Sequence, residues 1–421
     1  MGNRNEILVV GNGYDIANGL KTSFCDFMKP VLAEYIFFYI YHSHTSLFPH
    51  SEEYKSILTI FENFLGKPND NLRIKSDAFF KNQFIQILFH KYCPTITLLH
   101  AYMESEKTVN HFIGETKEKK IFKGKASQLQ GKIVELFKLL TQKGLTLDLK
   151  WFDVENIIAN VINEDIQSDL DKFISKADEE EFFSLLEEMS LSNYPFFKHN
   201  FTEINLQECQ EGLKLFSQSF REYLKLQEKE YKKSVSENLT NKTDLLPNNF
   251  FDYAISLNYT SVFMKALKQN SGVNYCFIHG CLKNNNIVIG TGSYSYDELI
   301  KDPTKYNDIN KIPFYKFFLR IFNDTDENYH TWIKDHSYAL TFYGFSFGIN
   351  DYDLIRELLL QSEPTTAKTL PYKKAELQQI TIYCLNQEEK NKTLINLTAC
   401  LNKDSMNMLK HILKVKLICD S

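Results

Sequence analysis

The sequence predicts an α/β fold in which a Rossmann-like parallel sheet carries helices on both faces. Short apolar runs rich in β-branched and aromatic residues recur along the chain, and glycine or a small polar residue ends each of them. Such runs, without polar alternation, are typical of strands buried on both faces, as in a parallel sheet. Helical patterns follow several of the runs, as expected for βα units.

Six apolar runs are predicted strands. They cover residues 7–10, 253–257, 275–278, 287–289, 338–343 and 382–385. Helices are predicted after the first, second and fifth runs, over residues 14–28, 261–268 and 351–361. The alternation of strands and helices indicates a doubly wound sheet rather than an all-β or all-helical architecture.

The segment between residues 30 and 245 has a different pattern. Apolar residues recur there at helical spacing, for example over residues 151–161. We expect residues 1–29 and 246–421 to form the nucleotide-binding sheet domain. Residues 30–245 are then an all-helical insertion that serves as a lid, an oligomer interface or a partner surface.

Composition and charge exclude several classes of protein. The 421 residues include 48 Lys and Arg against 53 Asp and Glu, so the net charge is -5 and no direct nucleic-acid partner is expected. The longest apolar stretch, residues 31–41, contains Glu34 and is shorter than the roughly 20 residues that span a bilayer. We therefore expect no membrane segment.

The cysteines point to a reducing compartment and not to a metal site. Eight cysteines are scattered along the chain without CxxC spacing, which is typical of reduced thiols and predicts a cytoplasmic protein. Cys276, His279 and Cys281 lie close in sequence, but a zinc site needs a fourth ligand and no paired cluster occurs elsewhere. No metal is expected.

The first glycine-rich loop resembles half of a dinucleotide-binding turn. Gly11-Asn12-Gly13 follows a predicted strand and precedes a predicted helix, so its backbone N–H groups would suit a pyrophosphate. Ile16 replaces the third glycine, and no acidic residue follows a strand about 20 residues further on, which disfavours a hydride-transfer enzyme. The alternative is a plain tight turn with Asp15 as a helix N-cap.

Polar residues at two further strand ends are the candidate catalytic groups. Asn258 and His279 follow consecutive predicted strands, so both side chains are expected to reach one pocket together with the glycine turn. A histidine can act as a general base near neutral pH, and an asparagine can orient a water molecule. Gly290 and Gly292 follow another apolar run and are candidate binding residues.

Residues 344–348 match the GxSxG pattern of a serine hydrolase, with Ser346 as the nucleophile. A normal triad would then need an acid and a histidine later in the chain. His411 is the only later histidine, and Asp404 precedes it by seven residues, which leaves too little chain for that arrangement. We prefer Ser346 as a ligand or turn residue and Asp351 as the start of a helix. Neither a P-loop nor an HExxH motif is present.

Taken together, these motifs resemble the bacteriophage abortive-infection AbiH family. The segments that carry the resemblance are residues 9–15, 19–22, 151–155, 256–260, 278–280 and 344–346 with Asp351. The family is in turn similar to sirtuin-like domains. This resemblance implies that NAD lies on the glycine turn, that Asn258 holds the ribose and the attacking water, and that His279 is the base. The predicted NAD-binding set is Gly11, Asn12, Gly13, Asp15, Thr260, Gly290, Gly292, Ser346 and Asp351.

The resemblance implies a homo-oligomeric anti-phage protein that cleaves the nicotinamide–ribose bond of NAD when a phage protein triggers it. The four-cysteine zinc module of deacetylating sirtuins is missing, which argues against protein deacetylation. A non-catalytic nucleotide sensor or scaffold, with the insertion contacting a phage product or a partner defence protein, is the alternative. Thr260 fits that alternative because sirtuin-like NADases usually have Asp there. A serine hydrolase acting through Ser346 is a third possibility.

Overall fold

The computed structural model describes residues 4–35, 79–80, 82–92, 154–163, 204–236, 246, 250–267, 272–292, 309–325, 328–334, 336–360 and 376–418. The chain divides into two compact units, one of Met1–Ser23 with Ser217–Ser421 and the other of Phe24–Phe216. Helix α12 (Leu206–Ser236) begins in the second unit and ends in the first. The first unit carries the sheet.

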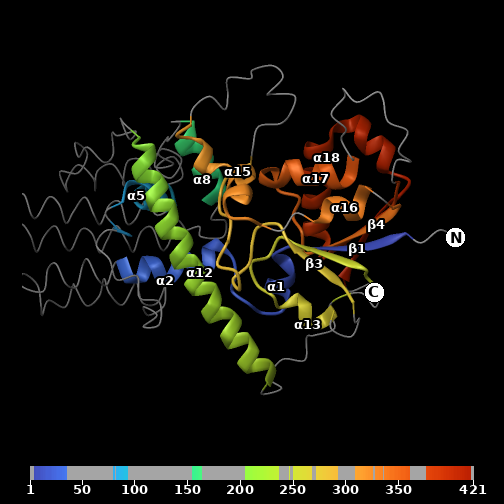
Figure 1. The fold of residues 1–421 in the computed structure, drawn as a ribbon, viewed down its shortest axis with the longest axis horizontal. Helices are drawn as coiled ribbons and strands as arrows, with labels where there is room; N and C mark the ends of the chain where they lie inside the picture. The colour runs from blue at the N-terminus through green and yellow to red at the C-terminus, as the bar shows by residue number, and fades with distance from the viewer. Residues whose placement is uncertain are drawn as a thin grey trace, which may run out of the picture. The chain divides into compact units, whose positions relative to one another are not determined.

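Within the described residues the sheet has six strands, all parallel, in the order β3-β2-β1-β4-β5-β6. Figure 1 labels β1, β3 and β4 of this sheet. The strands are β1 (Asn5–Val10), β2 (Tyr253–Ser256), β3 (Asn274–Phe277), β4 (Tyr338–Tyr343), β5 (Leu377–Cys384) and β6 (Leu413–Leu417). This is the order of a doubly wound sheet whose two halves diverge from neighbouring strands β1 and β4. The predicted fold class is confirmed.

Two strand assignments differ from the sequence-based expectation. Residues 287–289 are buried but belong to no strand of the sheet, and the nearby Thr291 forms an isolated bridge with Tyr315. A short apolar run is equally compatible with a buried irregular segment, so its composition alone misled the prediction. Strand β6 was missed because its residues alternate between polar and apolar, as suits the edge of the sheet.

The helix predicted over residues 14–28 is two helices, α1 (Gly13–Ala17) and α2 (Phe24–Tyr35). Gly19, with a φ of 85°, adopts the left-handed conformation that ends helices. The Leu20 N–H donates to the Asp15 carbonyl and closes the turn. The turn at Gly19 thus ends α1 after five residues and separates it from α2.

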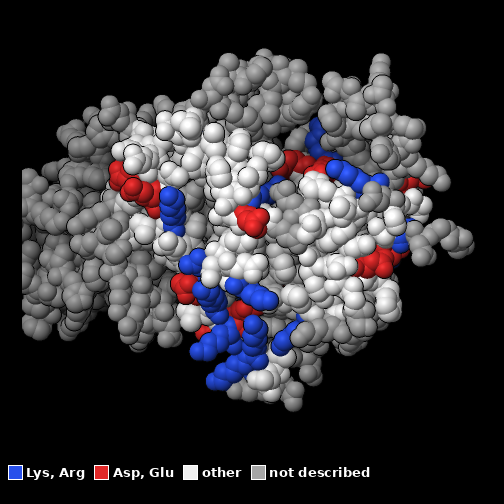
Figure 2. Space-filling model, in the orientation of Figure 1, with Lys and Arg blue, Asp and Glu red and all other residues white. Residues whose placement is uncertain are grey.

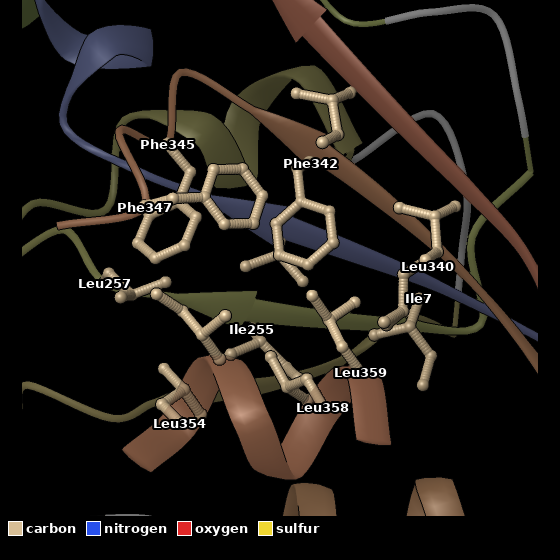
Figure 3. Close-up of a cluster of buried hydrophobic side chains, with 14 of the residues drawn as sticks. Ile7, Ile255, Leu257, Leu340, Phe342, Phe345, Phe347, Leu354, Leu358 and Leu359 are labelled. Carbon is tan, nitrogen blue, oxygen red and sulfur yellow. The ribbon is translucent and has the colours of Figure 1, made fainter. Parts of the chain in front are cut away.

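One face of the sheet packs on helices from the C-terminal half of the chain. These helices are α16 (Tyr329–Lys334), α17 (Tyr352–Leu360) and α18 (Gln387–Leu409). Figure 3 shows Leu354, Leu358 and Leu359 of α17 directed at apolar side chains of the strands. Each fully buried leucine stabilises the fold by about 1.5–3 kcal/mol relative to an exposed one, so this layer holds the strands in place.

The opposite face packs on α1, on α13 (Phe263–Leu267) and on the C-terminal part of α12. Successive residues of β1 point to opposite faces, so Leu8 and Val10 enter this second cluster while Ile7 and Val9 enter the first. Tyr14 of α1 packs edge-to-face on Tyr343 of β4, with ring centroids 5.7 Å apart. The glycine turn therefore starts from a strand that is buried on both faces.

The described part of the second unit consists of helices. They are α2, α5 (Gln83–Tyr92), α8 (Val154–Ile162) and residues 206–216 of α12. Phe216 of α12 packs on α2 and α5, with its ring centroid 5.3 Å from that of Phe27 and 6.3 Å from that of Phe84. No helix in the described ranges is long and apolar enough to cross a membrane.

The C-terminal half of α12 carries charges of both signs. Figure 2 shows Lys and Arg side chains gathered there with acidic side chains among them. Lys225 pairs with Glu222 at 3.0 Å, and Lys232 pairs with Glu228 at 3.3 Å. Glu228 also accepts a hydrogen bond of 2.6 Å from the Ser261 hydroxyl, which fastens the helix to the segment after β2.

Candidate functional site at the carboxyl edge of the sheet

The ends of three neighbouring strands bring the predicted catalytic residues to one edge of the sheet. The last residues of β1, β2 and β3 are register partners, namely Val10, Ser256 and Phe277. Asn258 and His279 each lie two residues beyond the end of their strand, and Asn258 lies near Asp15, which follows the turn after β1. Because all strands are parallel, these three groups share the carboxyl edge, where open α/β sheets bind ligands.

The glycine turn is in backbone contact with the loop after β4. The Gly13 N–H donates to the Gly344 carbonyl at 2.9 Å, and the Gly11 N–H donates to the Tyr343 carbonyl at 2.9 Å. A Cβ atom on Gly11 would lie 2.5 Å from the Gly344 oxygen. Both glycines are thus required by packing within the protein, and their predicted contact with a pyrophosphate stays a prediction.

Asn12 is held by the chain that follows α1. The Thr22 hydroxyl donates to the Asn12 side-chain oxygen at 2.6 Å. Asn12 is also the N-cap residue of α1, although its side chain makes no capping hydrogen bond. The interpretation of Asp15 as the N-cap is therefore wrong, since Asp15 is the third residue of this helix.

Asp15 is a buried carboxyl group with one oxygen unpartnered. The Thr260 hydroxyl donates to its Oδ2 at 2.6 Å, whereas its Oδ1 has no hydrogen-bond partner among the described residues. Burial raises the pKa of Asp15 to about 7, although Thr260 and Asn258 act in the opposite direction. The group can therefore change charge near neutral pH.

Asn258 lies beside Asp15 with its whole amide unpartnered. Only 2% of the residue is exposed, and neither its Oδ1 nor its Nδ2 has a hydrogen-bond partner within the part of the chain that the structure describes. The amide is near enough to lower the pKa of Asp15, but the pair does not reach hydrogen-bond geometry. A buried polar group left without a partner costs about 1–3 kcal/mol, which a ligand with matching groups would recover.

His279 is paired with Asp351, which follows β4 in the short helix η4 (Ile349–Asp351). The distance from His279 Nε2 to Asp351 Oδ1 is 3.1 Å, and Lys316 Nζ lies 2.9 Å from the same oxygen. Burial raises the pKa of Asp351, but Lys316 and His279 outweigh it and hold that pKa well below its usual range. Asp351 is therefore a carboxylate, which can only accept hydrogen bonds.

The charge state of His279 follows from its surroundings. Burial lowers its pKa, Asp351 opposes this, and the cations Lys316 and Arg320 add to the lowering. The lowered pKa favours the neutral imidazole at pH 7, and the Asp351 carboxylate, which can only accept, favours a proton on the facing Nε2. Nδ1 then holds the lone pair, so His279 has the form of a general base oriented by an aspartate.

Three charged residues of this site were not predicted from the sequence. Lys316 and Arg320 come from α15 (Lys316–Phe322), and Arg320 Nη1 donates to Asp353 Oδ2 at 3.0 Å. Arg320 Nη2 lies 3.5 Å from His279 Nε2. Two cations four residues apart in an otherwise apolar helix were the available signal, because such a pattern indicates buried charges rather than a solvated face.

Gly290 and Gly292 lie in a segment that packs against α15 and η4. A Cβ on Gly290 would lie 2.7 Å from the Phe314 carbonyl oxygen. The Gly292 N–H donates to Asn350 Oδ1 at 3.3 Å. Both glycines thus permit close backbone contacts next to Asp351, and their predicted role in ligand binding stays a prediction.

Ser346 does not have the surroundings of an activated nucleophile. It is exposed, its carbonyl accepts a hydrogen bond of 2.8 Å from Asn396, and its hydroxyl has no hydrogen-bond partner in the described ranges. The left-handed residues of this loop are Gly344 and Phe347, not the serine. Figure 3 shows Phe345 and Phe347 within the hydrophobic cluster, so the loop is shaped by packing.

Cys276, His279 and Cys281, which lie close in sequence, have different surroundings in the structure. Cys276 is buried in the first hydrophobic cluster, Cys281 is free, and His279 is engaged with Asp351. The described segments contain no group of three or more His, Cys, Asp or Glu residues that could hold a metal ion.

The fold and the site together define a doubly wound α/β protein with a buried polar cluster at the carboxyl ends of β1, β2 and β3. The chain matches the family model described as bacteriophage abortive infection AbiH over residues 7–372 and belongs to that family. This agrees with the resemblance carried by its motifs. No curated protein and no solved structure gave a match.

Proposed function

We propose that this protein is a cytoplasmic abortive-infection protein that binds NAD or a related nucleotide and hydrolyses its nicotinamide–ribose bond. The family to which the chain belongs supports the role in defence against phage. The unpartnered amide of Asn258 beside the unpartnered Asp15 oxygen carries the ligand proposal. These atoms offer one donor and two acceptors, which match the hydroxyl groups of a ribose.

In the proposed reaction, Asn258 positions the ribose and a water molecule, and His279 accepts the proton of that water. The water oxygen forms a bond to C1′ of the ribose, while the bond from C1′ to the pyridinium nitrogen breaks and its electron pair returns to nicotinamide. The products are nicotinamide, ADP-ribose and a proton, which passes from His279 to solvent. The resemblance to sirtuin-like domains supports this assignment of roles.

The neutral state of His279 supports its role as the base. A protonated imidazole could not accept a proton, and both the burial of His279 and the neighbouring cations favour the neutral form. Asp351 would fix the ring by accepting from Nε2, much as an aspartate orients the histidine of a catalytic triad, but with the roles of the two ring nitrogens exchanged.

The proposal is tested by incubating the purified chain with NAD, with and without lysate of phage-infected cells, and measuring free nicotinamide. We expect release that falls roughly 10² to 10⁴-fold in His279→Ala, because the general base is lost. Asn258→Ala should lose turnover as well. His336→Ala and Asn407→Ala, at exposed positions, are matched controls that should retain the full rate. A full rate in His279→Ala would remove the mechanism.

One observation favours a non-catalytic nucleotide sensor as the second candidate. Thr260 replaces an aspartate of the sirtuin-like pattern, and its hydroxyl is already committed to Asp15. A sensor would bind NAD in a calorimetric titration, would lose that binding in Asn258→Ala, and would release no nicotinamide under any condition. The two measurements together separate the candidates.

A further inference from the structure

Helix α15 has the reverse of the usual amphipathic pattern. Its two cations are buried, with Lys316 1% and Arg320 4% exposed, whereas Phe317 and Ile321 are 46% and 58% exposed. Lysine and arginine are almost never fully buried unless paired, because removing a charge from water is costly. Specific interactions must therefore offset the free-energy cost of burying Lys316 and Arg320.

Both buried cations form ion pairs with aspartates. Lys316 Nζ lies 2.9 Å from Asp351 Oδ1, and Arg320 Nη1 lies 3.0 Å from Asp353 Oδ2. The two aspartates are two residues apart, so one ion pair fastens α15 to η4 and the other fastens it to the first turn of α17. His279 lies within this frame, since its Nε2 is 3.1 Å from Asp351 and 3.5 Å from Arg320 Nη2.

We propose that Lys316 and Arg320 are positioning residues that keep His279 neutral with its proton on Nε2, and thereby reserve Nδ1 as the proton acceptor. The role of Nδ1 as a catalytic base rests on the proposed function. The tautomer of His279 can be observed without any substrate. Lys316 keeps Asp351 ionised, so Asp351 can only accept from Nε2. Arg320 places a second positive charge near the ring, which disfavours the imidazolium.

All the groups that face His279 enter this balance. Asp351 favours the imidazolium, whereas Lys316 and Arg320 oppose it. Asp353 neutralises Arg320, and the ring of Tyr259, with its centroid 6.5 Å from that of His279, is uncharged at neutral pH. Replacing Lys316 by the uncharged Met removes one cation near His279 and leaves the negative charge of Asp351 without that partner. The pKa of His279 should then rise.

The test is nitrogen NMR on the full chain labelled with ¹⁵N-histidine, in which the shifts of the two ring nitrogens report both tautomer and titration. The chain has 11 histidines, so His279→Gln identifies the signals. For the native protein we expect the Nε2–H tautomer and a titration midpoint below that of an exposed histidine. Lys316→Met should raise the midpoint, whereas Lys410→Met, at an exposed lysine, should not. A proton on Nδ1 in the native protein would overturn the proposal.

Two further variants separate positioning from simple stabilisation. Lys316→Met/Asp351→Asn removes both charges of the pair, so that neither charge is left buried without its partner. This double variant should lose the preference for the Nε2–H tautomer. Lys316→Arg keeps the charge and should restore the native midpoint in part. A Lys316→Met protein that folds and titrates like the native protein contradicts the inference.

The outcomes for this inference and for the proposed function are distinguishable. If NAD is hydrolysed, the acidic limb of the pH–rate profile should move to higher pH in Lys316→Met, in step with the NMR midpoint. If no nicotinamide is released but the tautomer and the shift are observed, the enzyme proposal fails and the positioning role stands. If NAD is hydrolysed but the midpoint of His279 is unchanged in Lys316→Met, the enzyme proposal stands and the positioning role fails.

Discussion

Asp15 shows how one buried side chain makes the stability of a fold depend on pH. Its pKa is raised from 3.8 to about 7 because the ionised form is poorly solvated beneath the glycine turn. The folded protein therefore holds a proton there that the unfolded chain has released between these two values. Stability from this group is fully present below about pH 4 and is lost as the pH rises to about 7.

We predict that Asp15→Asn removes this dependence. The two pKa values correspond to about 4 kcal/mol of unfolding free energy lost by the native protein across that range. Urea unfolding at several pH values should show a native protein that weakens from pH 4 to pH 7 relative to the variant. Asp404→Asn, at an exposed carboxyl, is the control and should follow the native curve. Parallel curves for Asp15→Asn and the native protein would contradict the prediction.

At the scale of elements, the glycine turn and the loop after β4 are in close backbone contact. Gly344 has a φ of 64°, and a Cβ on it would lie 2.4 Å from the Tyr14 nitrogen. Gly19 also has a positive φ, of 85°, but nothing lies within 4 Å of its Cβ position. The two glycines therefore separate backbone strain from crowding.

We predict that Gly19→Ala costs about 1–2 kcal/mol of unfolding free energy, which is the strain of alanine in the left-handed region. Gly344→Ala should cost about 1–3 kcal/mol more, because the added methyl meets backbone atoms that cannot move aside cheaply. Denaturant unfolding of both variants measures the difference. Equal losses would show that the loop after β4 moves freely.

Individual elements also show what the sequence could and could not predict. The central strands are continuous apolar runs, and the sequence located them because a strand covered on both faces needs no polar alternation. Residues 287–289 have the same composition but pack as an irregular segment, since burial alone does not require a ladder partner. Strand β6, half exposed at the edge, lacked the signal altogether.

The same reasoning applies to the site. Asn258 and His279 were predictable because parallel strands bring their carboxyl ends to one edge. Lys316 and Arg320 were not, because a charged residue is normally assigned to the surface and the aspartates that pair with them lie over 30 residues away. Only the three-dimensional arrangement shows that those charges compensate one another.

For the whole molecule, the division into two units has a consequence for folding. Both hydrophobic clusters that cover the sheet are built from residues of the first unit. The second unit interrupts that unit in sequence between Ser23 and Ser217, and none of its described residues belongs to these two clusters. The described residues of the first unit thus cover both faces of the sheet with a hydrophobic core of their own.

We predict that a chain in which residues 24–216 are replaced by a flexible linker still folds around the six-stranded sheet. Circular dichroism should show mixed α/β structure, and denaturant should unfold it in one cooperative transition. Leu340→Ala in that shortened chain should lower the unfolding free energy by about 2–5 kcal/mol, as expected for a packed core. A gradual transition that Leu340→Ala does not change would show that the insertion is needed.

The backbone seam between Gly11, Gly13 and Gly344 lies where strand order reverses, between β1 and β4. Doubly wound proteins commonly admit a ligand through that gap, with the two halves of a dinucleotide on either side. Here the seam is shut by main-chain atoms in direct contact. A nucleotide at this edge would consequently be confined to the half of the sheet formed by β1, β2 and β3. Asn258 and His279 follow strands of that half.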